Sequence, residues 1–85
     1  MGWHRMGDRN APFFDYPRVA REAGIAQDDL EKLVRVVYTL YEGDDMLASL
    51  HVLRTCRAVR DGHCAIREAI EEWRAEAEGQ EWHQE

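Results

Sequence analysis

Residues 19–33 have the sequence Val-Ala-Arg-Glu-Ala-Gly-Ile-Ala-Gln-Asp-Asp-Leu-Glu-Lys-Leu, which has the spacing of a helix-turn-helix. Ala20 is small enough to let two helices cross closely, and Gly24 can adopt the positive φ that ends a helix. Three apolar residues follow at intervals that fill the corner between two helices: Ile25, Leu30 and Leu33. The stretch therefore predicts two helices that meet at a tight corner.

The start of the second of these helices is acidic. In a helix-turn-helix protein that reads DNA, this start enters the major groove. Here it carries three acidic residues, namely Asp28, Asp29 and Glu31, opposed by a single cation, Lys32. The spacing favours a DNA-binding motif, whereas the charge argues against one.

Length and charge set limits on the whole chain. Its 85 residues suffice for one domain near the lower limit for a self-sufficient core, and such a domain often gains stability from a partner or from self-association. The net charge is −6, and it is distributed unevenly. Residues 1–21 carry four arginines and two aspartates (+2), residues 22–53 two basic and seven acidic groups (−5), and residues 54–85 five arginines and eight acidic groups (−3). Nucleic acid would therefore have to bind the N-terminal arm or a local arginine stripe.

Targeting and redox features are few. No apolar run reaches the length of a membrane span, and the first ten residues lack the apolar core of a signal peptide. We therefore expect a cytoplasmic protein without a membrane partner. Cys56 and Cys64 are too few for a disulfide scaffold and should be free thiols in that compartment.

Composition divides the chain into an irregular arm (1–15), a helical domain (16–78) and a frayed C-terminal tail (79–85). The arm contains three large aromatic residues that either pack back on the helices or dock on a partner: Trp3, Phe13 and Phe14.

Four helices are expected in the domain. The first runs from about Pro17, is capped by Asp15 and ends at Gly24. The second starts near Asp28, where Glu31 would complete a capping box, and shows a clean apolar face up to Tyr41.

The third helix is expected at about 46–60, with Asp44 or Asp45 as its cap, and the fourth at about 64–78, stopped by Gly79. The third is apolar on two sides, which is typical of a central helix or of an oligomer interface. No segment alternates as a strand does. The expected fold is all-α, a compact four-helix orthogonal bundle built from two helix-turn-helix pairs.

The chain also resembles a known family over residues 16–72. The segment Tyr16-x-x-Val-Ala-Arg-Glu-Ala-Gly-Ile-x-x-x-x-Leu is similar to the opening helix-turn-helix of MerR-type regulators, and residues 45–70 resemble the second helix pair of that family. The resemblance implies a dimeric DNA-binding regulator. Its phosphate contacts would include Arg18 and Arg21, and Gln27 and Lys32 would reach bases.

The chain also departs from that family in ways that argue against DNA binding. Its members place a basic β-wing between the two helix pairs, whereas this chain has only Tyr41-Glu-Gly-Asp-Asp there. Glu31, Lys32 and Leu33 replace the arginine and tyrosine expected on the second helix. Some MerR-like proteins, chaperone modulators among them, bind proteins instead of DNA, and an acidic chain without a wing resembles that branch. A plain helix corner with neither role also fits the spacing.

A basic stripe is predicted on the third helix, where Arg54, Arg57 and Arg60 recur every three residues. With Arg67, these guanidinium groups could bind a phosphate or an acidic partner. Alternatively, they pair with acidic residues of the fourth helix, which would be Glu68, Glu71 and Glu72.

Four residues are of metal-ligand type: His51, Cys56, His63 and Cys64. His51 and Cys56 lie about 140° apart around a helix, and the chain has no ligand knuckle, so neither a metal nor another cofactor is expected. Cys56 is expected in the core, and Cys64 at a helix start whose N–H groups would acidify its thiol. The chain has no phosphate loop and no nucleophile elbow, so we do not expect an enzyme.

The sequence thus favours a small non-enzymatic adaptor or regulatory protein, a subunit or modulator of a larger assembly that acts through protein–protein contacts with a partner or with itself. The contact residues would be Trp3, Phe13, Phe14, Arg54, Arg57 and Arg60. The alternative is the MerR-like DNA-binding regulator.

Overall fold

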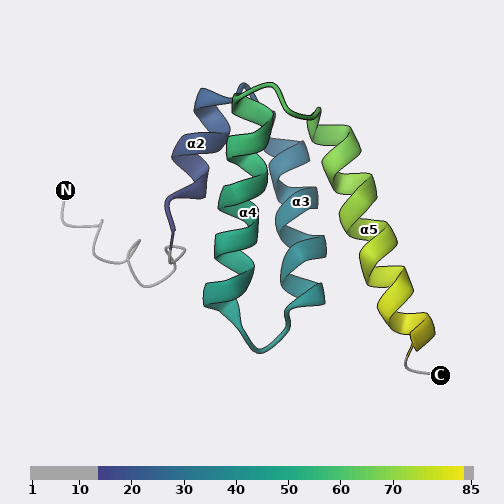
Figure 1. Ribbon diagram of the computed structural model, residues 1–85. Coiled ribbons are helices and arrows are strands. Elements are labelled where there is room, and N and C mark those ends of the chain that lie inside the picture. Colours follow the sequence, from purple (N-terminus) through teal and green to yellow (C-terminus); the bar gives the residue numbers. More distant parts are fainter. Residues whose placement is uncertain (1–13, 84–85) are drawn as a thin grey trace.

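The structure, a computed structural model, describes residues 14–83 as four helices (Figure 1). They are α2 (Tyr16–Glu22), α3 (Gln27–Leu40), α4 (Asp45–Arg60) and α5 (Ile66–His83). This part of the chain contains no strand, so the all-α four-helix fold is confirmed. None of the four helices combines the length and apolar character that a bilayer span requires. Trp3 and Phe13, with most of the predicted arm, lie outside the described residues.

The centre of the molecule is an antiparallel hairpin of α3 and α4 (Figure 1). Helix α2 packs on α4, and α5 packs mainly on α3. Helix α4 contacts all three other helices, which fits the prediction that a helix apolar on two sides lies centrally. The two predicted helix pairs therefore interlock, because the helices of one pair pack chiefly against those of the other.

The N-terminal corner has the local structure that its residues predict. The Asp15 side chain caps α2 by accepting a hydrogen bond from the backbone N–H of Arg18 at 3.4 Å. Gly24 has a φ of +76°, and the N–H of Ile25 donates to the carbonyl of Ala20 at 3.0 Å. The chain reverses there at little steric cost, and α3 begins three residues after Gly24.

The start of α3 corrects one prediction. The helix begins at Gln27, and its N-cap residue, Ala26, makes no side-chain cap, so the Asp28–Glu31 capping box is wrong. Asp28 and Asp29 lie instead in the first turn, where the helix dipole favours negative charge. Glu31 accepts a hydrogen bond from the Gln27 side chain at 3.3 Å.

The end of α5 corrects a second prediction, namely that a frayed tail begins at Gly79. Helix α4 is capped as expected, with the Asp44 carboxylate accepting from the N–H of Leu47 at 3.1 Å. Helix α5, however, runs through Gly79 to His83, so residues 79–83 are helical and not a frayed tail. Gly79 does not have a positive φ. A glycine inside a helix costs only about 1 kcal/mol, and its alanine and glutamate neighbours offset that penalty.

The core lies between α2, α3, α4 and the first half of α5. Leu33, Val37, Val52 and Cys56 are fully shielded from solvent, so the predicted core role of Cys56 is confirmed. Leu30 is buried and Ile25 partly buried at the corner, as the opening stretch predicted.

Candidate functional site

A groove with a volume of about 350 Å³ lies between α4 and α5. This volume is in the range of pockets that hold small molecules or single side chains. From α4 the groove is lined by His51, Arg54, Thr55 and Ala58, and from the chain that follows by Cys64, Ala69, Glu72, Trp73 and Glu76. The groove thus combines an aromatic wall with charges of both signs.

The aromatic wall is held by hydrogen bonds and ring contacts. The Trp73 indole N–H donates to Thr55 Oγ1 at 3.1 Å, and the Thr55 hydroxyl donates to the carbonyl of His51 at 2.9 Å. The His51 ring stacks on Tyr41 with centroids 4.7 Å apart and meets Trp73 in an edge contact at 5.4 Å. These contacts pre-organise the orientation of Trp73, which lowers the entropy lost when a ligand binds against it.

The rim of the groove carries separated charges. Arg54 is exposed on α4, and Glu72 and Glu76 are exposed one turn apart on α5. Among the described residues, the Arg54 guanidinium has no carboxylate within 4 Å. The groove therefore offers an uncompensated cation on its α4 side and two anions on its α5 side.

Cys64 behaves differently from the prediction. Burial raises the pKa of its thiol, and the carboxylates of Glu72 and Glu68 raise it further. The predicted acidification is wrong, because Cys64 lies in the turn before Ile66 and faces glutamates. Among the described residues, no three His, Cys, Asp or Glu side chains come together in a group that could hold a metal ion.

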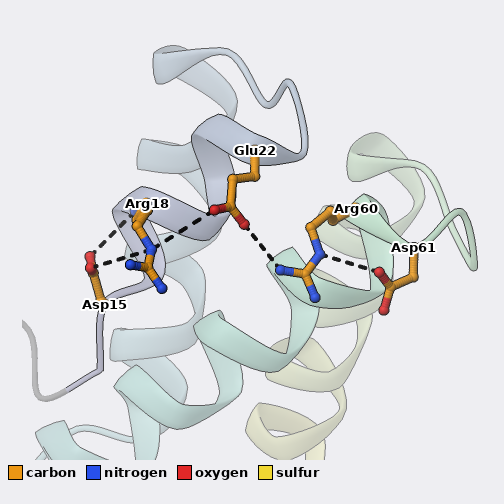
Figure 2. Close-up of polar contacts among 5 residues, drawn as sticks. All are labelled: Asp15, Arg18, Glu22, Arg60 and Asp61. Carbon is orange, nitrogen blue, oxygen red and sulfur yellow. Dashed lines mark hydrogen bonds and ion pairs between the residues drawn. The ribbon is translucent and has the colours of Figure 1, made fainter.

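The three arginines of the predicted stripe have different environments. The Arg60 guanidinium lies 3.1 Å from the Glu22 carboxylate of α2 and 3.2 Å from that of Asp61 (Figure 2). Arg60 therefore does not pair with the acidic residues of α5, because α2 is the helix beside this end of α4. It is engaged within the fold. Arg57 is exposed, without a carboxylate within 4 Å in the described part of the chain.

The residues proposed for DNA contact lie among carboxylates. Arg18 is 3.9 Å from both Asp15 and Glu22, as Figure 2 shows. Gln27 is bonded to Glu31, and of these four residues Arg21 and Lys32 are exposed with no carboxylate within 4 Å among the described residues. This surface would meet a phosphate backbone with little free positive charge.

A second hollow of about 510 Å³ lies between α2 and α3. Its lining is mainly apolar and comprises Tyr16, Pro17, Gln27, Leu30, Glu31, Val34 and Arg35. Phe14 is partly buried against the core, so its ring serves the fold at least in part. Arg35 and Glu31 both line this hollow, and among the described residues the Arg35 guanidinium has no carboxylate within 4 Å.

The aromatic wall was not predicted from the sequence. His51 and Trp73 line the groove from different helices, and Tyr41, which stacks on His51, comes from a third segment. Helical periodicity does not show which of these segments adjoin. Comparison with known proteins gave no match to a protein-family model, to a curated protein or to a solved structure.

Proposed function

We propose that this chain is a small non-enzymatic adaptor that binds a segment of another protein in the α4–α5 groove. The observation that carries this proposal is the pairing of Trp73 on one wall with the uncompensated Arg54 on the other. Tryptophan and arginine are the residue types that most often dominate the binding energy of protein interfaces.

The charges of the groove specify what the segment looks like. An apolar side chain would contact Trp73, Ala58 and Ala69, and a neighbouring carboxylate would pair with Arg54. Glu72 and Glu76 would repel that carboxylate from the α5 side, so the segment would bind in one orientation. The proposed ligand is therefore a protein segment with an apolar residue next to an acidic one.

Affinity capture from the native cell extract, followed by binding measurements with the purified partner, tests the proposal. Arg54→Glu replaces the cation of the groove, and Arg74→Glu makes the same change at an exposed position of α5 that does not line it. We expect proteins retained by the wild type and by Arg74→Glu to be lost with Arg54→Glu. Calorimetry should then show partner affinity at least about tenfold weaker for Arg54→Glu alone.

A second variant tests the groove itself. Ala58→Glu places a larger, charged side chain on the groove wall. We expect it to abolish binding while the helical content, measured by circular dichroism, is retained. A purified partner that binds Arg54→Glu and Ala58→Glu as tightly as the wild type would overturn the proposed site.

A further inference from the structure

The hollow of about 510 Å³ between α2 and α3, here called the α2–α3 hollow, has an open apolar lining. Leu30 is buried within it, and Tyr16, Pro17 and Val34 are partly exposed. Partly exposed apolar side chains are stabilised when further apolar surface covers them. The volume lies in the range of pockets that hold small molecules or side chains. The α2–α3 hollow therefore favours an apolar occupant such as an aromatic ring.

The edge of the α2–α3 hollow has an excess of negative charge where α3 begins. Glu31 lines the hollow and has no cation within 4 Å among the described residues. The exposed Asp28 lies seven residues before Arg35, which places the two within about 20° of each other around α3. Asp28 thus lies on the side of α3 that forms this edge. An occupant that carries a cation next to its apolar group fits both features.

The segment that precedes α2 joins the domain at the α2–α3 hollow. Residues 1–13 lie outside the described residues, and α2 begins with Tyr16 and Pro17, which both line the hollow. Asp15 has φ −82° and ψ 61°, and the N–H of Tyr16 donates to the carbonyl of Phe14 at 2.8 Å. This geometry is an inverse γ-turn, which bends the chain away from the axis of α2. Residues 1–13 are therefore attached at the edge of the hollow.

The length of this segment is sufficient for it to cross the hollow. Trp3 lies 13 residues before Tyr16, and 13 residues span at most about 45 Å. The hollow extends about 12 Å along α3, from Gln27 to Arg35. Trp3 can therefore reach every part of the hollow.

We propose that residues 1–13 occupy the α2–α3 hollow of their own chain, with the Trp3 ring against Leu30 and Val34. The segment carries two arginines and one aspartate, so its charge is opposite to that of the hollow edge. Arg5 follows Trp3 by two residues, and Glu31 follows Leu30 on α3. A Trp3 ring on Leu30 thus brings the Arg5 guanidinium within reach of the Glu31 carboxylate, where the two pair.

Charge and attachment select this occupant over others. An acidic partner would be repelled by Asp28 and Glu31. A basic, apolar segment of another protein, or of a second copy, has suitable chemistry but binds from free solution. A segment joined to the same chain beside its site has an effective concentration in the millimolar range. This inference is independent of the proposed function, since the α2–α3 hollow and the α4–α5 groove share no lining residue.

Nuclear Overhauser contacts in the full chain test the placement of Trp3. With the leucine and valine methyl groups labelled with carbon-13, we expect cross-peaks between the Trp3 indole protons and the methyl groups of Leu30 and Val34. Trp3→Ala alters no residue of the four helices. It should shift those methyl signals by removing the ring current, and leave the signals of Leu53, which does not line the hollow, in place. If Trp3 contacts neither methyl group and Trp3→Ala shifts neither signal, the proposal is wrong.

A charge exchange tests the pairing of Arg5 with Glu31. Arg5→Glu and Glu31→Arg each bring like charges together and should weaken the docking equilibrium, read from the Leu30 and Val34 methyl shifts, about two- to fivefold. The variant with both substitutions should recover the wild-type shifts. Glu71→Arg, exposed on α5 and outside the hollow, is the control and should behave as the wild type. A double variant as weakly docked as the single variants would refute the pairing.

A mixture of labelled and unlabelled chains distinguishes the chain's own segment from that of a second copy. We expect the Trp3 cross-peaks to arise within one chain only and to be unchanged on dilution. Cross-peaks that join a labelled to an unlabelled chain would show that another copy fills the hollow, which would overturn the proposal.

Discussion

The hydrogen bond between Tyr38 and Ser49 joins the two helices of the central hairpin, and its removal should reduce stability measurably. The Ser49 side chain is fully buried on α4, and its Oγ lies 2.8 Å from the Tyr38 hydroxyl on α3. Ser49→Ala deletes the bond and leaves the partly buried Tyr38 hydroxyl short of a partner. A lost bond with one orphaned group costs about 1–3 kcal/mol.

A second tyrosine near Tyr38 narrows the range of the expected loss of stability. Burial raises the pKa of the Tyr16 phenol above its usual value, and the neighbouring Tyr38 raises it further. Tyr16 therefore lies close to Tyr38. The freed Tyr38 hydroxyl can therefore turn toward Tyr16 and recover part of the lost energy. We expect Ser49→Ala to lower the free energy of unfolding by about 1–2 kcal/mol, a large part of the roughly 5–15 kcal/mol of a small domain.

A double-mutant cycle separates the bond from other effects of each substitution. Tyr38→Phe leaves the Ser49 hydroxyl buried without its partner, whereas the variant with both substitutions orphans neither group. The double variant should therefore lose about 1 kcal/mol less than the sum of the two single losses. Urea denaturation followed by far-ultraviolet circular dichroism measures all four proteins. Losses that add to within about 0.3 kcal/mol would show that no bond couples the two helices.

Further predictions concern stability, pH and DNA. Gly24→Ala should lower the free energy of unfolding by about 1–2 kcal/mol, because φ is +76° at this position. Gly79→Ala, in the interior of α5, should raise the free energy of unfolding by about 0.5–1 kcal/mol. Urea denaturation measures both changes. Leu33→Ala should cost about 2–5 kcal/mol by the same assay, because its side chain is fully buried at the helix corner. Burial raises the pKa of Cys56 from 9.0 to about 11, so the folded state keeps a proton that the unfolded chain has lost. The free energy of unfolding should consequently fall between about pH 9 and pH 11, and the fall should be smaller in Cys56→Ala. Fluorescence anisotropy with random duplex DNA should show no binding at low salt, and binding that weakens steeply as salt rises would instead support the regulator alternative.

Local rules predicted most of the fold. Helical periodicity located the four helices, and the apolar residues of the opening stretch, such as Leu30 and Leu33, are buried where that stretch placed them. The caps at Asp15 and Asp44 were predictable because a cap requires only a short polar side chain next to the first turn.

The predictions that were wrong share a cause, because one residue can take more than one local role and the sequence pattern does not decide between them. Gly79 can end a helix, but strong helix formers on both sides carry α5 past it to His83. Asp28 can cap a helix, but the chain turns early enough after Gly24 for α3 to begin before it. The aromatic wall of the groove depends on which helices adjoin, and a helical period does not contain that information.

The arginines of α4 show how one regular spacing can yield three environments. A step of three residues falls short of a full helical turn, so each arginine is rotated by about 60° from the one before. Over two steps this rotation carries the side chains from the groove at Arg54, through the exposed position of Arg57, to the α2 side at Arg60, where Glu22 pairs with Arg60. Of the three evenly spaced arginines, Arg60 thus makes an ion pair inside the fold. Arg54 and Arg57 remain exposed cations, and only Arg54 lines the groove. Arg54→Glu should therefore weaken partner binding more than Arg57→Glu, which changes a cation that does not line the groove.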